Sequence, residues 1–402
     1  MRRVLPFCLL ACLPLAAQVA PIPAPTQLPG SPFVIKNNWV IGGTGGWDYL
    51  AIDPTAKRLY IAHDHSVQVV DLDSGSLVGE ISGFHEAHAI ALEDIGHYGY
   101  VSDGLANAIA VFDRGTLKIE STISIGCSPR SIAFEPQSKL VFAVCSADAA
   151  APAPSSPLRS PQVTSHVIAI DTASRTVLAD MIMAGDFRFA QAIGDGQVYV
   201  TVYPANQRSP QQIAKLDGPA IAAEAQRLDA ESKTPSPGET VVFDWSRKNP
   251  PNSLVRFVVP ATCRNPQSFA VDHKDRRLFA ACDNQQLVVL DSGTGALIAN
   301  MTTGPGDDVI GYDPERELIY SANGGGYGSL TIIQQDANVD SYAVVQNLPT
   351  LGRARTLAVD PSTGNVYLVT DYMGVDLTPR GGFGTIKPTP IAGSFRVLVV
   401  GH

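Results

Sequence analysis

The chain has 402 residues, a formal net charge of −9, 45% hydrophobic residues and only 17% charged residues. The apolar content is ample for a large core, and the negative charge argues against general nucleic-acid binding, which needs a basic surface. The 35 glycines and 30 prolines fit a turn-rich, all-β chain.

The first 32 residues predict a targeting segment followed by a leader. Residues 1–17 combine Arg2 and Arg3 with an apolar run and the small residues Ala16 and Ala17, as signal peptides do. Residues 18–32 are rich in proline and predict a flexible leader. We therefore expect a periplasmic or secreted protein without a transmembrane span, and lipid anchoring through Cys12 is a less favoured alternative.

Residues 33–402 repeat one unit of three short strands separated by turns. The first copy runs through Leu50–Pro54, Arg58–His63 and Val67–Asp71. The aromatic residue of the second strand recurs at Tyr60, Tyr100, Phe142, Tyr199, Phe279, Tyr320 and Tyr367. The intervals Tyr60–Tyr100, Tyr100–Phe142 and Phe279–Tyr320 are 40, 42 and 41 residues, and a period near 40 is typical of propeller blades. The seven copies predict an all-β fold, a single seven-bladed β-propeller of four-stranded blades.

The two ends of the repeat region predict how the ring closes. The seventh copy ends with a third strand, Phe395–Val400, and has no fourth strand of its own. An unmatched apolar run, Phe33 to Ile41, precedes the first copy. We expect this N-terminal segment to supply the outer strand of the last blade, since closure removes exposed sheet edges.

Two of the second strands, Tyr100-Val101-Ser102-Asp103 and Tyr320-Ser321-Ala322-Asn323, come close to a Tyr-Val-Thr-Asn tetrad. On these tetrads the chain resembles the YVTN-type β-propeller repeat family, whose members are extracytoplasmic propellers similar to WD40 and quinoprotein propellers. The resemblance implies the fold over residues 33–402. It implies little about function, because the tetrad marks strands and turns.

Four cysteines remain after the signal peptide, and their repeat positions pair them. Cys145 and Cys282 both end a second strand, whereas Cys127 and Cys263 both precede the first strand of the same blades. The start of one strand and the end of the next lie side by side in an antiparallel hairpin. We therefore expect the disulfides Cys127–Cys145 and Cys263–Cys282 in an oxidising compartment, with four buried thiols as the alternative.

Three loops are longer than the repeat requires, at residues 147–161, 203–239 and 372–393. Each joins the second strand of a blade to the third, so all three are expected on the face that also carries the connections between blades. Function on repeat scaffolds concentrates where loops are elaborated. The Ala/Pro/Ser-rich loop at 147–161 is the one for which a neutral insertion is the better interpretation.

One residue per blade, two positions before the apolar start of the first strand, is expected to line the central channel. These ring residues are Asp48, His88, Arg130, Phe189, Gln267, Asp308 and Arg355. Their polar character suits a small anionic ligand, because arginine pairs well with carboxylate or phosphate. The alternative is that Asp–Arg pairs only join neighbouring blades. His85 and His88 are weak metal-ligand candidates, and solvated or hydrogen-bonded histidines are the better interpretation.

The sequence favours a non-enzymatic scaffold that binds a ligand or a protein partner through its loop-rich face. We expect a monomer with no bound cofactor and no catalytic residues. One alternative is a channel-sited hydrolase of the lactonase kind, using His88, Arg130 and Asp48, or a cofactor-dependent oxidoreductase. A second is single-stranded nucleic-acid binding through Arg188, Phe189, Arg353 and Arg355, which the net charge disfavours.

Overall fold

A computed structural model describes residues 32–148, 164–203, 239–244, 253–336, 338, 340–375 and 388–402. The expected signal peptide and almost all of the leader lie outside these residues. The same holds for most of the three long loops. The two ends of the third loop are described and pair as a short ribbon of β28 (Met373–Val375) and β29 (Pro388–Pro390).

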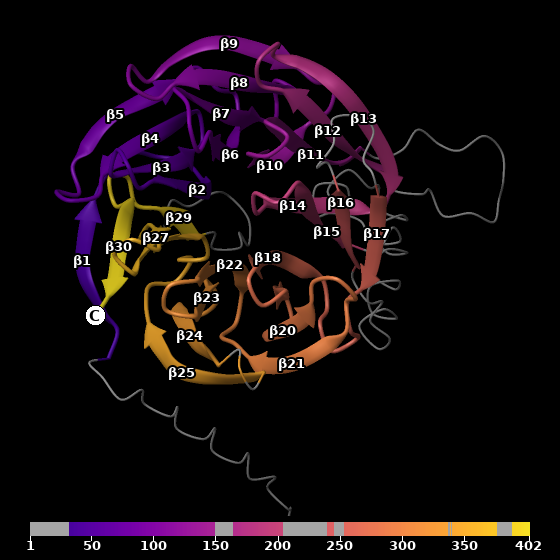
Figure 1. Cartoon of the computed structure of the whole chain (residues 1–402). Coiled ribbons are helices and arrows are strands. Elements are labelled where there is room, and N and C mark those ends of the chain that lie inside the picture. The colour runs from indigo at the N-terminus through magenta and orange to yellow at the C-terminus, as the bar shows by residue number, and fades with distance from the viewer. Residues whose placement is uncertain are drawn as a thin grey trace, which may run out of the picture.

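Within the described residues, seven four-stranded antiparallel sheets surround a central channel as the blades of a propeller (Figure 1). From the channel outward, the first blade contains β2 (Trp47–Asp53), β3 (Arg58–His63), β4 (Ser66–Asp71) and β5 (Leu77–Ser82). The second contains β6 (Ala87–Leu92), β7 (Tyr98–Asp103), β8 (Ala108–Asp113) and β9 (Lys118–Ser124). The third contains β10 (Pro129–Glu135), β11 (Leu140–Asp148), β12 (Thr164–Asp171) and β13 (Thr176–Ala184).

The chain continues around the ring in the same order. The fourth blade contains β14 (Asp186–Ala192), β15 (Gln197–Tyr203), β16 (Glu239–Asp244) and β17 (Ser253–Val258). The fifth contains β18 (Pro266–Asp272), β19 (Arg277–Cys282), β20 (Gln286–Asp291) and β21 (Leu297–Thr302). The sixth contains β22 (Asp307–Asp313), β23 (Leu318–Asn323), β24 (Ser329–Asp336) and β25 (Ser341–Pro349).

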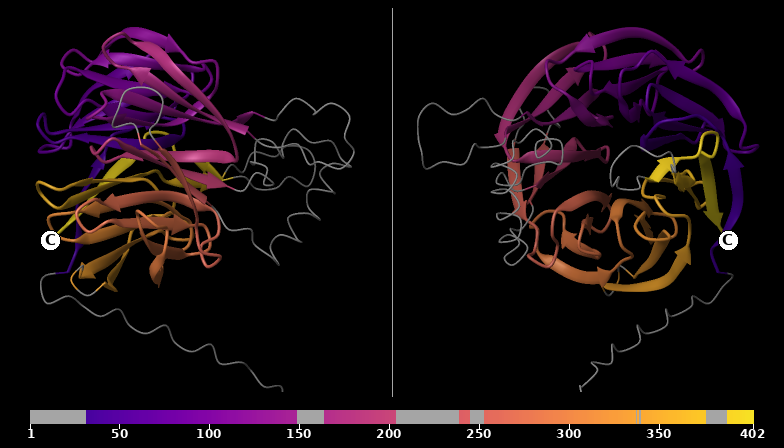
Figure 2. Two further views of the ribbon diagram at one scale, coloured as in Figure 1. Left: turned by 45° about the vertical axis from the view of Figure 1, so that its right-hand side comes forward. Right: turned by 180° about the vertical axis from the view of Figure 1, so that it is seen from behind.

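The last blade joins the two ends of the propeller region. Its inner strands are β26 (Leu357–Asp360), β27 (Asn365–Thr370) and β30 (Arg396–Gly401), and its outer strand is β1 (Val34–Val40). Antiparallel pairing of β1 with β30, from Val34 opposite Gly401 to Val40 opposite Arg396, confirms the predicted closure by the N-terminal segment. Seen from behind in Figure 2, the two strands again lie side by side.

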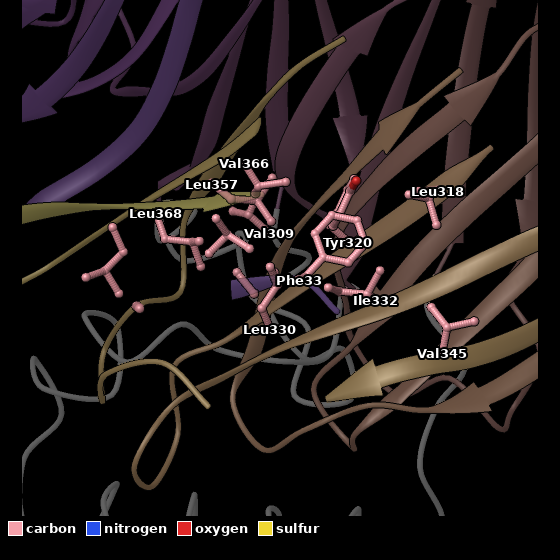
Figure 3. Packing of buried hydrophobic residues seen from close by; sticks show 14 residues of the cluster. Phe33, Val309, Leu318, Tyr320, Leu330, Ile332, Val345, Leu357, Val366 and Leu368 are labelled. Carbon is pink, nitrogen blue, oxygen red and sulfur yellow. The ribbon is translucent and has the colours of Figure 1, made fainter. Parts of the chain in front are cut away.

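Phe33 anchors this closing strand in the neighbouring sixth blade. Its side chain is 1% exposed and packs edge-on against Tyr320, with 5.9 Å between the ring centroids (Figure 3). Its backbone amide donates to Gln346 Oε1 at 2.9 Å, and its carbonyl accepts from Gln346 Nε2 at 2.9 Å. The segment therefore ties the sixth blade to the seventh as well as completing the seventh sheet.

Strand direction divides the molecule into two faces. The loop face carries the starts of the innermost strands, the connections between blades and the loops from second to third strand. The turn face carries the opposite ends, with the turns from first to second and from third to fourth strand. Where the structure describes their side chains, the second and third strands of the blades are largely buried and rich in β-branched residues, which pack well between stacked sheets.

On the turn face, an acidic side chain at the end of an innermost strand binds the next blade. Asp53 accepts from Arg114 Nε at 3.1 Å, and Glu135 accepts from the Gly196 amide at 3.0 Å. Burial alone would raise the pKa of Asp53, but the Arg114 contact and backbone donors lower it overall. These buried carboxylates therefore join blades while their oxygens accept hydrogen bonds.

Both predicted disulfides are present in the structure. Cys127–Cys145 has a Cα–Cα distance of 5.9 Å, and Cys263–Cys282 has one of 5.2 Å. Each bridge sits at the loop-face end of one hairpin, where Pro129 pairs with Cys145 and Pro266 pairs with Cys282. The repeat positions of the cysteines were therefore sufficient to identify the partners.

Candidate functional site in the central channel

The strand register gives each blade one residue at the loop-face start of the channel. The reference is the residue opposite the second-strand aromatic: Ala51 opposite Tyr60, and Gln191 opposite Tyr199. In six blades the residue three positions earlier is the expected one: Asp48, His88, Arg130, Gln267, Asp308 or Arg355. In the fourth blade the residue at this position is Arg188. Phe189 occupies the following position, so the ring is more basic than the sequence count suggested.

Two contacts within this ring join adjacent blades. His88 Nδ1 lies 2.8 Å from Asp48 Oδ2, and the other ring nitrogen of His88 lies 3.4 Å from Glu86 Oε2. Arg355 Nε lies 3.4 Å from Asp308 Oδ2. These pairs agree with the interpretation that ring charges hold neighbouring blades together, at least for the first and second blades and for the sixth and seventh.

The other three ring residues have different surroundings. Arg188 pairs with Asp186 on its own strand, and Gln267 Nε2 donates to the Asn265 carbonyl at 3.2 Å. Arg130 is partly exposed and makes no ion pair or hydrogen bond with any residue that the structure describes. Among the described ring residues, the Arg130 guanidinium is thus the cation that could bind an added anion without first losing a partner.

A polar recess of about 340 Å³ opens on the loop face beside the sixth and seventh blades. It is lined by Gln267, Gly306, Asp307, Asp308, Gly324, Gly325, Arg353 and Arg355, and we call it the mouth. Glycine is required here because a Cβ on Gly306, whose φ is +70°, would lie 2.5 Å from the Gly325 amide nitrogen. Arg353 binds Asp371 at 2.6 Å and lies over the Trp47 ring at 4.6 Å.

The two adjacent aspartates of the mouth hold protons more tightly than ordinary carboxyls. Desolvation raises the pKa of Asp307 to about 7, opposed by hydrogen bonds from Ser321 at 2.6 Å and Thr303 at 2.9 Å. Desolvation also raises the pKa of Asp308 to about 6, with Arg355 opposing and Asp48 adding to the rise. The charge of the mouth therefore changes between pH 5 and pH 8.

The weak metal candidates do not come together. His85 is 70% exposed at its side chain and lies 3.4 Å from Asp103, while His88 lies between Asp48 and Glu86. In the described part of the chain, no group of three or more His, Cys, Asp or Glu side chains is arranged to hold a metal ion.

Below the mouth, aromatic rings meet across the channel. Tyr49 and Phe189 come from non-adjacent blades, yet their ring centroids lie 5.4 Å apart. Phe189 also contacts Phe269 edge-on at 5.3 Å. We call these three residues the aromatic septum, because they lie between the polar mouth and the lower half of the channel.

A larger cavity of about 740 Å³ lies on the turn-face side of the septum. Its walls come from the innermost strands of the first, fourth, fifth, sixth and seventh blades and are mostly aliphatic or aromatic. The sequence interpretation placed function only on the loop face and missed this cavity. The signal was present in the apolar second halves of the innermost strands, for which the sequence analysis proposed no ligand-binding role.

No protein-family profile matches the chain, and no curated protein sequence matches it. Solved structures do match. One, titled "Structure of U3-55K", has a TM-score of 0.62 and 11% identity and covers 89% of this chain and 97% of that chain. The "Crystal structure of RRP9 WD40 repeats" gives a TM-score of 0.63 and 11% identity, with 90% and 96% coverage. A chain of the "Crystal Structure of Mitotic Checkpoint Complex" gives 0.58 and 12%, with 91% and 95% coverage.

At these identities the likeness shows the fold alone. The protein is an all-β propeller with four-stranded blades, similar to WD40 propellers. Membership of the YVTN-type family stays a prediction. In the part of the chain that the structure describes, there is also no helix with the length and apolar character needed to span a bilayer.

Proposed function

We propose that this chain is a monomeric periplasmic or secreted propeller of seven blades that binds a protein partner through its loop face and has no catalytic activity of its own. The observation that carries the proposal is the exposure of large apolar side chains on that face. These are Leu105 at 69%, Tyr327 at 96%, Tyr372 at 43%, Met373 at 38% and Ile391 at 49%.

These exposed side chains have the composition of a protein interface. Tyrosine, methionine and arginine are enriched at interfaces, and tyrosine and arginine supply a large part of the binding energy. Tyr372, Met373 and Ile391 lie at the base of the third long loop, and Tyr327 lies on a glycine-rich turn of the sixth blade. Arg353 and Arg355, with side chains 38% and 50% exposed, lie between them at the mouth.

The mouth fits this proposal as the polar centre of an apolar surface. A partner that lays a carboxylate side chain over the mouth would meet Arg355 and Arg353, and Arg130 across the channel offers a further cation. Each of the two mouth arginines already faces an aspartate, so the partner would compete with Asp308 and Asp371 for them. Such competition gives specificity more than affinity.

An extracytoplasmic location is supported by the chemistry of the cysteines. Disulfides persist in oxidising compartments and are rare in the cytosol. Two disulfides in a chain whose first residues have signal-peptide features support export to the periplasm or beyond. The mass of the mature protein, purified from its own compartment, tests cleavage near residue 17 and reports any attached lipid.

The partner proposal is tested with a matched pair of variants. Tyr327 on the loop face and Ile95 on the turn face are both 96% exposed, so Tyr327→Ala and Ile95→Ala remove equally exposed apolar groups. Chemical cross-linking in the native compartment with quantitative mass spectrometry compares both with the wild type. We expect a partner cross-linked by the wild type and by Ile95→Ala, with its yield reduced about tenfold in Tyr327→Ala. Equal yields in both variants would refute the proposal.

A further inference from the structure

The turn-face cavity is a second, separate site. We propose that it binds one neutral, predominantly apolar small molecule, independently of any partner on the loop face. No step of this proposal depends on the function assigned to the loop face. It rests on the size, the closed inner end, the charge balance and the surroundings of the cavity.

The size and lining match small-molecule sites in general. Such sites commonly enclose about 300 to 1,000 Å³ and are lined by apolar and aromatic side chains with a few polar groups. The cavity of about 740 Å³ falls in this range. Leu50, Ile52, Val309, Leu357 and Val359 are among its aliphatic lining residues, and Tyr312 adds an aromatic one.

The aromatic septum closes the inner end of the cavity. Because Tyr49 and Phe189 meet across the channel, a molecule entering from the turn face meets a wall of rings rather than the charged mouth. Aromatic walls favour planar apolar ligands through stacked and edge-on contacts. The innermost strands are also sheet edges, so backbone amide and carbonyl groups lie at the cavity wall to orient a polar atom of the ligand.

Each charged group at the rim already has a hydrogen-bond or ion-pair partner, which favours a neutral ligand. Asp272 accepts from Tyr312 Oη at 3.1 Å and from Gln335 Nε2 at 2.9 Å. His273 lies 3.4 Å from Asp195, and Lys274 lies 3.9 Å from Glu317. A charged ligand would have to break one of these pairs or enter an apolar space without a partner, and both are unfavourable.

The surroundings favour a small molecule over a protein. Protein interfaces surround their centre with further apolar contact area. Among the described turns of the turn face, Ile95 is the one large hydrophobic residue that is exposed, and it lies on the second blade, which does not line the cavity. The exposed Leu77, Val177 and Leu297 stand at the starts of outer strands, away from the channel, so the apolar surface within the ring is separate from them and has the size of a ligand site.

Two fluorescent probes that share one skeleton provide the test. N-phenyl-1-naphthylamine is neutral, and 8-anilino-1-naphthalenesulfonate is the same ring system with a sulfonate. We expect saturable one-to-one binding of the neutral probe to the full mature chain, at least about tenfold tighter than the anionic probe. Calorimetry should show a negative heat-capacity change, the marker of apolar burial. Absence of saturable binding, or tighter binding of the anionic probe, overturns the proposal.

Variants then locate the site. Val359→Asp and Ile52→Asp place a charge on two adjacent walls of the cavity, the seventh and the first blade, at partly exposed positions, and each should weaken the neutral probe at least about tenfold. Ile182→Asp is the matched control, because Ile182 is 62% exposed on an outer strand away from the channel. Near-UV circular dichroism checks folding, and either cavity variant that folds suffices. If the control weakens the probe equally, the probe binds the outer surface and the proposal fails.

Tyr327→Ala separates this site from the loop face. The substitution should leave affinity for the neutral probe unchanged, because Tyr327 lies on the other side of the septum from the cavity. A large change in affinity would mean that the probe binds on the loop face. That result would contradict the cavity proposal and would leave the proposed partner binding on the loop face unaffected.

Discussion

The mouth and the turn-face cavity are built by the same innermost strands, yet their chemistry is opposite. Each of these strands has its ring residue, mostly charged, close to its first residue and continues into an apolar half. In the sequence of a single strand, a polar start followed by an apolar end does not by itself indicate a binding site. Arranged in a ring, the starts combine into a polar recess and the ends into an apolar cavity, and the aromatic septum separates them.

The two regions also treat buried carboxylates differently. On the turn face, Asp53 and Asp272 are fully partnered by groups from the next blade. In the mouth, Asp307 accepts from two hydroxyl groups and Asp308 lies beside Arg355, yet desolvation raises the pKa of both. Carboxylates that serve architecture are thus satisfied, whereas the mouth keeps charges that can respond to a partner or to pH.

The largest expected effect comes from breaking the ring on which both regions depend. Phe33→Ala should lower the free energy of unfolding by about 3 to 5 kcal/mol, because a fully buried aromatic side chain is lost from the sixth-blade core. Urea denaturation measures the change. The neighbouring Val34→Ala is the control, since Val34 is 46% exposed, and it should cost well under 1 kcal/mol. Similar losses in the two variants would contradict the role of Phe33.

The disulfides should act mainly on the loop face. Replacing Cys127 and Cys145 together by alanine should cost about 3 kcal/mol, because the bridge closes a segment of 18 positions. Hydrogen exchange should accelerate more at the loop-face end of the third blade than at its turn-face end. Uniform acceleration along the blade would show that the bridge stabilises the whole sheet instead.

The free energy of unfolding should depend on pH through Asp307, and the direction of this dependence follows from its pKa. Its folded-state pKa of about 7 lies above the unfolded value of 3.8, so the folded chain binds more protons between these values. Its contribution to stability therefore falls as pH rises, by about 1 kcal/mol between pH 6 and pH 8. Asp307→Asn should remove this fall in urea midpoints measured at the two pH values. An unchanged pH profile in the variant would show that Asp307 is ionised throughout.

The smallest effect is expected at Arg130. Arg130→Ala should change the free energy of unfolding by less than about 0.5 kcal/mol, because the guanidinium has no ion pair or hydrogen bond within the described ranges. Arg355→Ala is the comparison, since it leaves Asp308 without its ion-pair partner and should cost more. If Arg130→Ala costs as much as Arg355→Ala, Arg130 is a structural residue.

Most of the fold could be predicted from the sequence because each blade repeats the same strands and turns. The pairing of β1 with β30 followed from a missing fourth strand, and the disulfides followed from equivalent repeat positions. The ring position failed in one blade. In that blade the count started at Gln191, one residue later than the equivalent Ala190, and only the pairing of Gln191 with Tyr199 corrects it.

The cavity could not be predicted for a different reason. Leu50, Ile310 and Val359 each have the character of core residues, and a strand pattern does not distinguish packing against a neighbour from facing an open channel. Five such strands must be placed around one axis before a hollow of about 740 Å³ is evident. The position and pairing of single strands could therefore be predicted, whereas the cavity that the strands enclose together could not.

The return of the N-terminal strand to the last blade has a consequence for how the chain reaches its native state. Phe33 and its partner Gln346 are 313 positions apart. At synthesis rates of about 5 to 20 residues per second, roughly 15 to 60 s separate the appearance of the two residues. During that time an apolar strand has no partner to pair with. A chain that closes in this way would gain from a chaperone that shields its N-terminal strand until the last blade is synthesised. We expect its folding to be slow, because the closing contact spans nearly the whole ring.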